Sequence, residues 1–176
     1  MIKELLNKQD INRIISRIAH EIIEKNKGTA GLCMVGIQRG GVYLARRIAK
    51  KIEALEGTKI PVGSLDITLY RDDIGIRKEQ PLVRKTDIEC DISGMKIVLV
   101  DDVLFTGRSI RAAMDALMDI GRPAQIQLAV LIDRGHRELP IRADYAGKNI
   151  PTSKTENIEV QLEEDGFEDR VVLIQD

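Results

Sequence analysis

Apolar residues recur along this chain with two different spacings. Continuous or alternating apolar runs predict β-strands over residues 31–37, 62–70, 97–100, 126–133, 158–162 and 171–174. Between several of these runs, apolar positions three and four residues apart predict amphipathic helices over residues 11–27, 42–55 and 110–120. Strands that alternate with helices are typical of an α/β domain with a mostly parallel central sheet flanked by helices.

The first predicted helix has an isoleucine stripe and a polar face. Asp10 is a plausible N-cap, and Gly28 ends the helix. The stripe consists of Ile11, Ile14, Ile15, Ile18, Ile22 and Ile23. The opposite face carries Arg13, Ser16, Arg17, His20 and Lys27. For most surface helices such a face is simply solvated.

Composition narrows the class of protein. A chain of 176 residues is enough for one domain with a substantial core, and we treat residues 1–176 as one unit. The net charge of −1 excludes a chain that is basic throughout, so any nucleic-acid site must be a local patch. Cys33 and Cys90 lie far apart and predict no disulfide framework. With no apolar run of membrane-spanning length and no visible leader peptide, the sequence predicts a cytoplasmic protein without membrane contact.

One stretch of thirteen residues carries most of the chemistry. A buried strand, Ile97–Val100, is followed by Asp101 and Asp102 and then by the small polar turn 106–109 that opens a helix. Backbone N–H groups, hydroxyls and the positive end of the helix dipole suit a phosphate there. The carboxylates repel phosphate but can accept hydrogen bonds from sugar hydroxyls or face a cation. The ligand described in this way is a ribose 5-phosphate.

Two further segments add charge near the predicted sheet. Residues 38–41, with Arg39, Gly40 and Gly41, form a second junction between a strand and a helix. Residues 71–87 are charged and lack periodicity, and long polar connections of this kind are usually functional or mobile. After the strand at 126–133, the polar segment 134–145 is followed by a turn-rich loop at 147–153.

The thirteen-residue stretch resembles the 5-phosphoribosyl 1-diphosphate (PRPP) motif of type I phosphoribosyltransferases. That resemblance implies a flexible lid at about 71–87 and a small hood made of about 134–155 and the C-terminal strands. The same resemblance implies that residues 38–41 are the loop that contacts pyrophosphate. Many relatives have arginine where Gly40 stands, whereas this chain has Arg39.

Four segments together resemble one family, PyrR, the bacterial regulators of pyrimidine operon attenuation that are also uracil phosphoribosyltransferases. They are residues 17–24, 65–73, 103–108 and 133–144. The resemblance implies transfer from PRPP to uracil, giving UMP and pyrophosphate, with Mg²⁺ as cofactor. It assigns catalysis to Asp101, Asp102, Arg39 and Arg71, with the two aspartates facing the metal through water or ribose hydroxyls. It assigns PRPP and UMP binding to Val100, Asp101, Asp102, Val103, Leu104, Phe105, Thr106, Gly107, Arg108, Ser109, Arg39, Gly40 and Gly41.

The resemblance also implies UMP-dependent binding to the leader mRNA of pyrimidine genes. Carried over by position, the RNA contacts fall on Ser16, His20, Arg137, Arg142 and Lys148. For either arginine, a surface salt bridge is an equally good explanation. The family and the isoleucine-rich helix suggest a homo-oligomer, a dimer or larger.

Two other functions stay open at this point. The chain could be a purine phosphoribosyltransferase without an RNA role, which would transfer to hypoxanthine or guanine. It could also be an RNA-binding nucleotide sensor with negligible catalysis, which would bind ligand without forming product.

Overall fold

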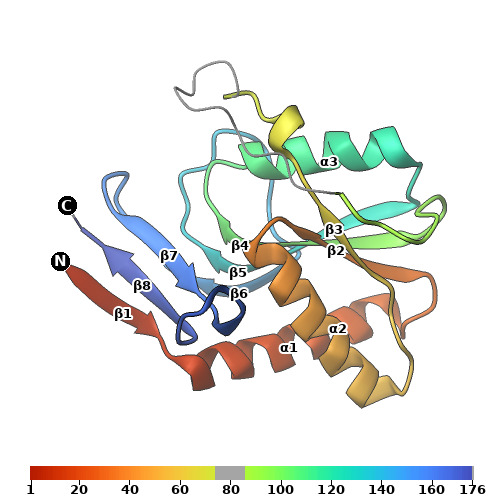
Figure 1. Ribbon diagram of the computed structural model, residues 1–176, viewed down its shortest axis with the longest axis horizontal. Helices are drawn as coiled ribbons and strands as arrows, with labels where there is room; N and C mark the ends of the chain where they lie inside the picture. The colour runs from red at the N-terminus through yellow and green to blue at the C-terminus, as the bar shows by residue number, and fades with distance from the viewer. Residues whose placement is uncertain (74–85, 176) are drawn as a thin grey trace.

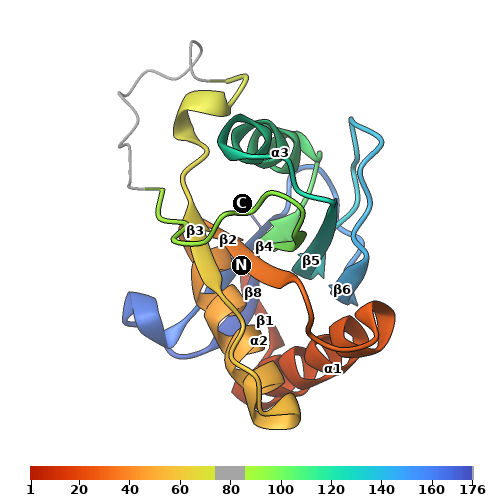
Figure 2. The same cartoon turned by 90° about the vertical axis from the view of Figure 1, so that its right-hand side faces the viewer.

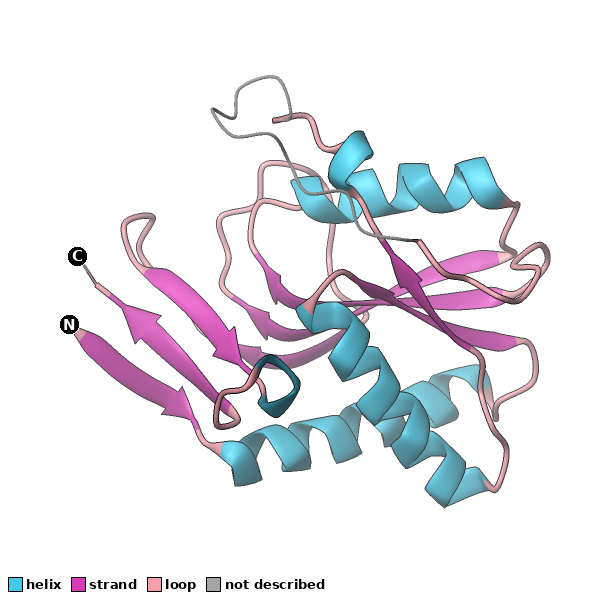
Figure 3. Ribbon diagram, in the orientation of Figure 1, coloured by secondary structure: helices cyan, strands magenta, loops and turns pink. Residues whose placement is uncertain are grey.

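The computed structural model describes residues 1–73 and 86–175, and residues 74–85 of the expected lid lie outside this range. Five parallel strands form the main sheet in the order β3-β2-β4-β5-β6 (Figures 1 and 3). They are β2 (Leu32–Ile37), β3 (Val62–Leu65), β4 (Lys96–Leu104), β5 (Gln125–Asp133) and β6 (Tyr145–Asn149). The predicted α/β class with a parallel sheet flanked by helices is confirmed.

Helices cover both faces of this sheet (Figures 1 and 2). One face packs against α1 (Lys8–Asn26) and α2 (Gly40–Glu56), and the other against α3 (Arg108–Ile120). The alternation of side chains along the strands divides the core accordingly. Met34 and Val98 face α1 and α2, whereas Val35 and Leu99 face α3.

The first helix begins one turn earlier than the sequence predicted. Asn7 is the N-cap, and its Oδ1 accepts a hydrogen bond from the Asp10 N–H at 3.0 Å. Asp10 occupies the third helical position and returns the bond, with its Oδ2 accepting from the Asn7 N–H at 3.1 Å. This is a capping box, which satisfies two backbone donors at once. The assignment of Asp10 as N-cap was therefore wrong.

A second, antiparallel sheet joins the two ends of the chain. Its order is β1 (Ile2–Leu6), β8 (Arg170–Ile174) and β7 (Asn157–Gln161), and β1 was not predicted. The 3₁₀ helix η2 (Glu163–Asp165) lies between β7 and β8. Arg47 of α2 fastens this region to the main body, because its guanidinium pairs with Glu164 and, at 2.7 Å, with the buried Asp169.

Two predicted strands end at other residues in the structure, so these two predicted boundaries are wrong. The strand expected at 62–70 stops at Leu65 because the Asp66 carboxylate accepts from the Thr68 N–H at 2.8 Å, which starts the 3₁₀ turn η1 (Thr68–Tyr70). The strand expected to end before Asp101 continues to Leu104, because pairing with β5 continues through both carboxylates.

The loop expected at 147–153 begins three residues later, since residues 145–149 are the edge strand of the main sheet. Gly147 allows this close packing, because a Cβ there would lie 2.3 Å from the Leu131 carbonyl oxygen. Thus β6 joins the parallel sheet, while the C-terminal strands form the smaller sheet with β1. Within residues 1–73 and 86–175, no helix combines the length and apolar character that a membrane span needs.

Candidate functional site

The two strand–helix junctions singled out in the sequence meet at one place. In the main sheet β2 lies between β3 and β4, so the chain order reverses between β2 and β4. Ligands of open α/β sheets bind at the carboxyl ends of the strands at such a switch point. A Cβ on Gly41 would lie 2.3 Å from the Val100 carbonyl oxygen, and a Cβ on Gly40 would lie 2.8 Å from Oδ2 of Asp102. The two glycines therefore let the junction at residues 38–41 pack directly on Asp101 and Asp102.

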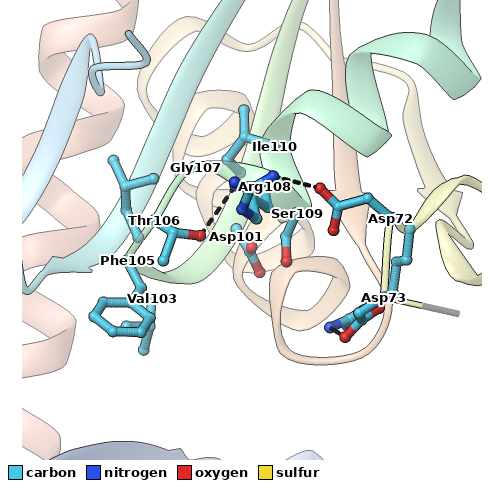
Figure 4. A pocket seen from close by; sticks show the side chains of 12 residues that line it. Asp72, Asp73, Asp101, Val103, Phe105, Thr106, Gly107, Arg108, Ser109 and Ile110 are labelled. Carbon is cyan, nitrogen blue, oxygen red and sulfur yellow. Dashed lines mark hydrogen bonds and ion pairs between the residues drawn. The ribbon is translucent and has the colours of Figure 1, made fainter. Parts of the chain in front are cut away.

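A cleft of about 250 Å³ opens beside this junction (Figure 4). Its lining includes Phe105, the whole turn at 106–109 and, from the other side, residues 71–73. A second hollow of about 300 Å³ adjoins it and shares Arg71, Asp101, Val103 and Ser109 with the first. Predicted ligand-binding residues thus line one continuous depression at the carboxyl end of β4.

The turn at 106–109 is built to receive an anion. Gly107 has φ +93° and is the N-cap of α3, and no side chain caps the helix. The first turn of α3 contains no acidic residue. Thr106 Oγ1 accepts a weak hydrogen bond of 3.3 Å from the Arg108 N–H. The helix terminus therefore offers backbone donors and a positive dipole end to a phosphate.

The two aspartates at the centre differ in their electrostatics. Burial, followed by the adjacent charge of Asp102, raises the pKa of Asp101 well above its usual range, and Arg71 opposes that shift. Asp101 Oδ1 accepts from the Asp102 N–H at 2.9 Å, and Asp102 Oδ1 accepts from the Val103 N–H at 2.8 Å. These bonds orient both carboxylates, of which Asp101 lines both hollows and Asp102 lines the second. A raised pKa at a cleft carboxylate is typical of a functional site.

The acidic pair does not form a complete metal cage. Among the described residues, no group of three or more His, Cys, Asp and Glu side chains is arranged to hold a metal ion. Two carboxylates with room for ligand oxygens and water do match the way Mg²⁺ is usually held beside phosphates. The donor set therefore fits a cation that is bound together with a phosphorylated ligand.

The three arginines predicted at this site have different surroundings. Arg71 lines both hollows and is held by two hydrogen bonds of 2.9 Å to the Asp73 carboxylate. Arg108 lines the cleft but directs its guanidinium to Asp72 at 2.6 Å (Figure 4) and to Glu138 at 3.0 Å. Arg39 is paired with Asp165 of η2 and does not line either hollow.

The residues expected to contact RNA also fall into different environments. Ser16 and His20 lie on α1, and Arg17 between them donates to the carbonyls of Ala146 and Gly147, which joins α1 to β6 beside the exposed Lys148. Arg142 is exposed on the segment before β6. These positions place cations along one edge of the sheet and the neighbouring helix.

Arg137 is the exception, because its guanidinium is half-buried and directed inward. It donates to the carbonyls of Phe105 at 2.8 Å and Ile141 at 2.9 Å, and it pairs with Asp133 at the end of β5. The Arg137 side chain therefore connects the residue before the turn at 106–109, strand β5 and the segment that leads to Arg142. Arg137 lines neither hollow, and its contacts brace the backbone at Phe105 from behind the cleft.

Sequence reasoning missed several residues that line the site. Asp66, Ile67 and Thr68 belong to the second hollow, although the sequence placed them inside a strand. Asp66 and Thr68 directly follow an apolar run, which was the available signal. The ring of Phe105 is covered by the Arg134 guanidinium at 4.1 Å and meets the His136 ring edge-on at 5.8 Å. These two contacts hold the Phe105 ring in place beside the turn at 106–109.

Comparison with known proteins agrees with this geometry. The phosphoribosyl transferase domain family matches residues 1–165. The chain is 60% identical over 173 residues to the Bifunctional protein PyrR of Caldicellulosiruptor bescii, covering 98% of this chain and 95% of that protein. It is 58% identical to the Bifunctional protein PyrR of Halalkalibacterium halodurans, covering 99% and 98%.

Solved structures share the same fold at lower sequence identity. A hypoxanthine phosphoribosyltransferase from Staphylococcus aureus superimposes with a TM-score of 0.68 and 22% identity, covering 89% of this chain and 80% of that protein. A hypoxanthine phosphoribosyltransferase from Trypanosoma cruzi gives a TM-score of 0.69 and 22% identity, covering 85% and 81%. At this identity the likeness supports the fold alone.

Proposed function

Because the chain belongs to the PyrR family of phosphoribosyltransferases, we propose that it has two linked activities. The first is transfer of phosphoribose from PRPP to uracil, which yields UMP and pyrophosphate. The second is UMP-dependent binding to the leader mRNA of pyrimidine genes, which controls their transcription by attenuation. The observation that carries the proposal is the course of β4, which leads from two fixed carboxylates into a glycine-capped helix terminus at the switch point.

The phosphoribose is held at its two ends. The turn at 106–109 takes the 5′-phosphate with backbone N–H groups and the hydroxyls of Thr106 and Ser109, which line the cleft. Asp101 and Asp102 accept hydrogen bonds from the ribose hydroxyls. Val100, Val103 and Leu104 lead into the turn from β4, and Gly40 and Gly41 let the β2 junction pack against Asp102 and Val100. Such clamping orients the anomeric carbon for attack.

Departure of pyrophosphate leaves an oxocarbenium-like sugar and concentrates negative charge on the leaving group. Preorganised cations stabilise that charge in a water-poor cleft. Arg71 already lies in the cleft, and Arg39 reaches it by leaving Asp165. Mg²⁺ fits as the cofactor here, and the Asp101–Asp102 pair would hold it together with a phosphorylated ligand and water. When bound, Mg²⁺ supplies further charge neutralisation to the leaving group.

In this proposal uracil binds beside Phe105, which lines the cleft, and the segment that follows Ile132 covers the base. Backbone amides and carbonyls in this segment can read the edge of the base. We assign no general base.

The RNA surface lies along α1, β6 and the segment between β5 and β6. It carries Ser16, His20, Arg142 and Lys148, with Arg137 beneath it. Contacts of this kind are mainly electrostatic, so RNA binding weakens steeply as salt rises. A homo-oligomer would align two such surfaces, and a nascent transcript as partner places the protein in the cytoplasm.

The first experiment measures pyrophosphate release from PRPP and Mg²⁺ with uracil, hypoxanthine, guanine, adenine or orotate. Turnover with uracil alone supports the proposal. Turnover with a purine base would instead favour a purine phosphoribosyltransferase. Binding of UMP without turnover would favour a nucleotide sensor with negligible catalysis. Leader RNA is then titrated with and without UMP, and an affinity that ignores UMP contradicts the second activity.

A further inference from the structure

The two cysteines lie in direct contact, although 57 positions separate them in the sequence. The Sγ atoms of Cys33 and Cys90 are 3.3 Å apart, and neither belongs to a disulfide. Cys33 lies in β2 and is fully buried, while Cys90 is partly exposed. A disulfide requires a sulfur separation of about 2.05 Å. The two side chains therefore need to approach by only a little over 1 Å.

The backbone on both sides of Cys90 is held in place. Asp87 exchanges two backbone hydrogen bonds of 2.8 Å with Ser64 of β3. Two residues after Cys90, the side chain of Ile92 is buried in the core beneath α3. Cys90 is thus fixed against β2 rather than carried on a free loop. Two thiols held in this way react with a high effective concentration.

Cys90 is also reachable from outside. It lines a surface cleft of about 460 Å³ together with Glu89 and Lys59–Gly63. Cys33 has no such opening, and burial raises the pKa of its thiol to about 12. The pair therefore combines one accessible thiol with one buried partner, the arrangement that separates an attacking cysteine from a resolving one.

We propose that Cys33 and Cys90 form a thiol–disulfide exchange site for low-molecular-weight disulfides such as oxidised glutathione. The Cys90 thiolate attacks one glutathione sulfur, the glutathione disulfide bond breaks, and one glutathione leaves and takes up a proton. Cys33 then loses its proton to water, its sulfur displaces the second glutathione from Cys90, and that departing thiolate takes up a proton. Two protein thiols are oxidised to one disulfide, and one oxidised glutathione is reduced to two thiols.

The site lies away from the phosphoribosyl cleft. Cys33 pairs with Ile97 near the start of both strands, whereas the lining of the phosphoribosyl site begins at Ile37 in β2 and at Asp101 in β4. Four steps of strand lead from Cys33 to Ile37, a distance of about 13 Å at ordinary strand rise. The disulfide therefore fastens the segment around Cys90 to β2 and stabilises the fold while leaving the reacting groups in place.

The test treats reduced protein with oxidised glutathione and follows intact mass and peptide maps. The wild-type chain should lose two hydrogen atoms and form a Cys33–Cys90 peptide pair. Cys33→Ala should instead keep one glutathione on Cys90, and Cys90→Ala should stay unmodified. A wild-type chain that remains reduced, or that keeps glutathione on Cys90 as its final product, overturns the proposal.

A second measurement compares oxidised and reduced wild-type protein directly. Oxidation should raise Tm by about 5 °C or more, because it constrains the unfolded chain, and a dithiol reductant should reverse the rise. Pyrophosphate release with uracil should change by less than twofold. An unchanged Tm or a loss of turnover would contradict the stated consequence of the crosslink. Because mass and Tm require no activity, this test remains decisive even where the proposed transfer reaction fails.

Discussion

Gly40, the first residue of α2, packs against the Asp102 side chain of the neighbouring strand β4, since a Cβ on residue 40 would lie 2.8 Å from Oδ2 of the aspartate. The obstructing atom is the end of a side chain, so it can move aside. We expect Gly40→Ala to fold but to displace the Asp102 carboxylate. Transfer from PRPP should fall at least tenfold, equivalent to about 1.4 kcal/mol, while Tm changes by no more than about 2 °C.

Two other glycines, Gly41 in the first turn of α2 and Gly57 at its C-cap, provide controls for that variant. Gly41→Ala places a Cβ 2.3 Å from the backbone oxygen of Val100, which cannot move freely, so it should destabilise the fold strongly. Gly57→Ala has open space but φ +71°, so it should cost about 1 kcal/mol of stability and leave transfer unchanged. Full activity of Gly40→Ala would contradict the contact.

Replacement of Asp101 should separate stability from activity. Burial and Asp102 raise the folded-state pKa of Asp101. A raised pKa means that the stability contributed by protonation is complete below the unfolded pKa and is lost as pH rises through the folded pKa. Asp101→Asn carries no buried charge at any pH. It should therefore be more stable than the wild type above the folded pKa, with the difference shrinking in acid.

Urea unfolding at several pH values measures this effect, and PRPP turnover should fall at least tenfold in the same variant. The exposed Glu168 supplies the control, because Glu168→Gln removes a carboxylate without changing a buried charge. Equal stability of wild type and Asp101→Asn across the pH range would show that burial does not raise the pKa of the Asp101 carboxyl.

Arg137 and Arg142 should respond differently to truncation. Arg142 is exposed, so Arg142→Ala should weaken leader RNA binding about tenfold, reduce its salt dependence by about one unit of slope, and spare transfer.

Arg137 ties Phe105 to Asp133, so Arg137→Ala should lower Tm by several degrees and impair both activities. RNA titrations, uracil turnover and thermal unfolding of both variants give the comparison. A transfer rate unaffected in Arg137→Ala would argue for an RNA contact alone.

Under the proposed function, Asp165, which pairs with Arg39, competes with pyrophosphate for that guanidinium. An exposed ion pair is worth at most about 1 kcal/mol, so Asp165→Asn should lower the KM for PRPP by up to about fivefold. Glu163→Gln is the matched control, because Glu163 lies on the same 3₁₀ helix but pairs with Lys8. An increased KM in Asp165→Asn would mean that the aspartate positions Arg39 productively.

The elements that the sequence predicted well are those in which one short segment contains its own signal. The isoleucine stripe of α1, the apolar run before Asp101 and the glycine that opens α3 are each read from a few adjacent residues. Two of the predicted boundaries failed because a neighbouring strand intervened. Pairing with β5 carries β4 past its carboxylates, and β6 forms because its glycine lets β5 approach.

The sequence by itself thus determined the α/β alternation, the turn at 106–109 and the pair of Asp101 and Asp102, because these depend on residues adjacent in the chain. Only the tertiary structure decided which distant residues meet. It pairs Arg39 with Asp165, turns Arg137 inward, and brings Cys33 to within 3.3 Å of Cys90. Such contacts follow from strand order and register, which are set by packing of the whole core, and no local pattern encodes them.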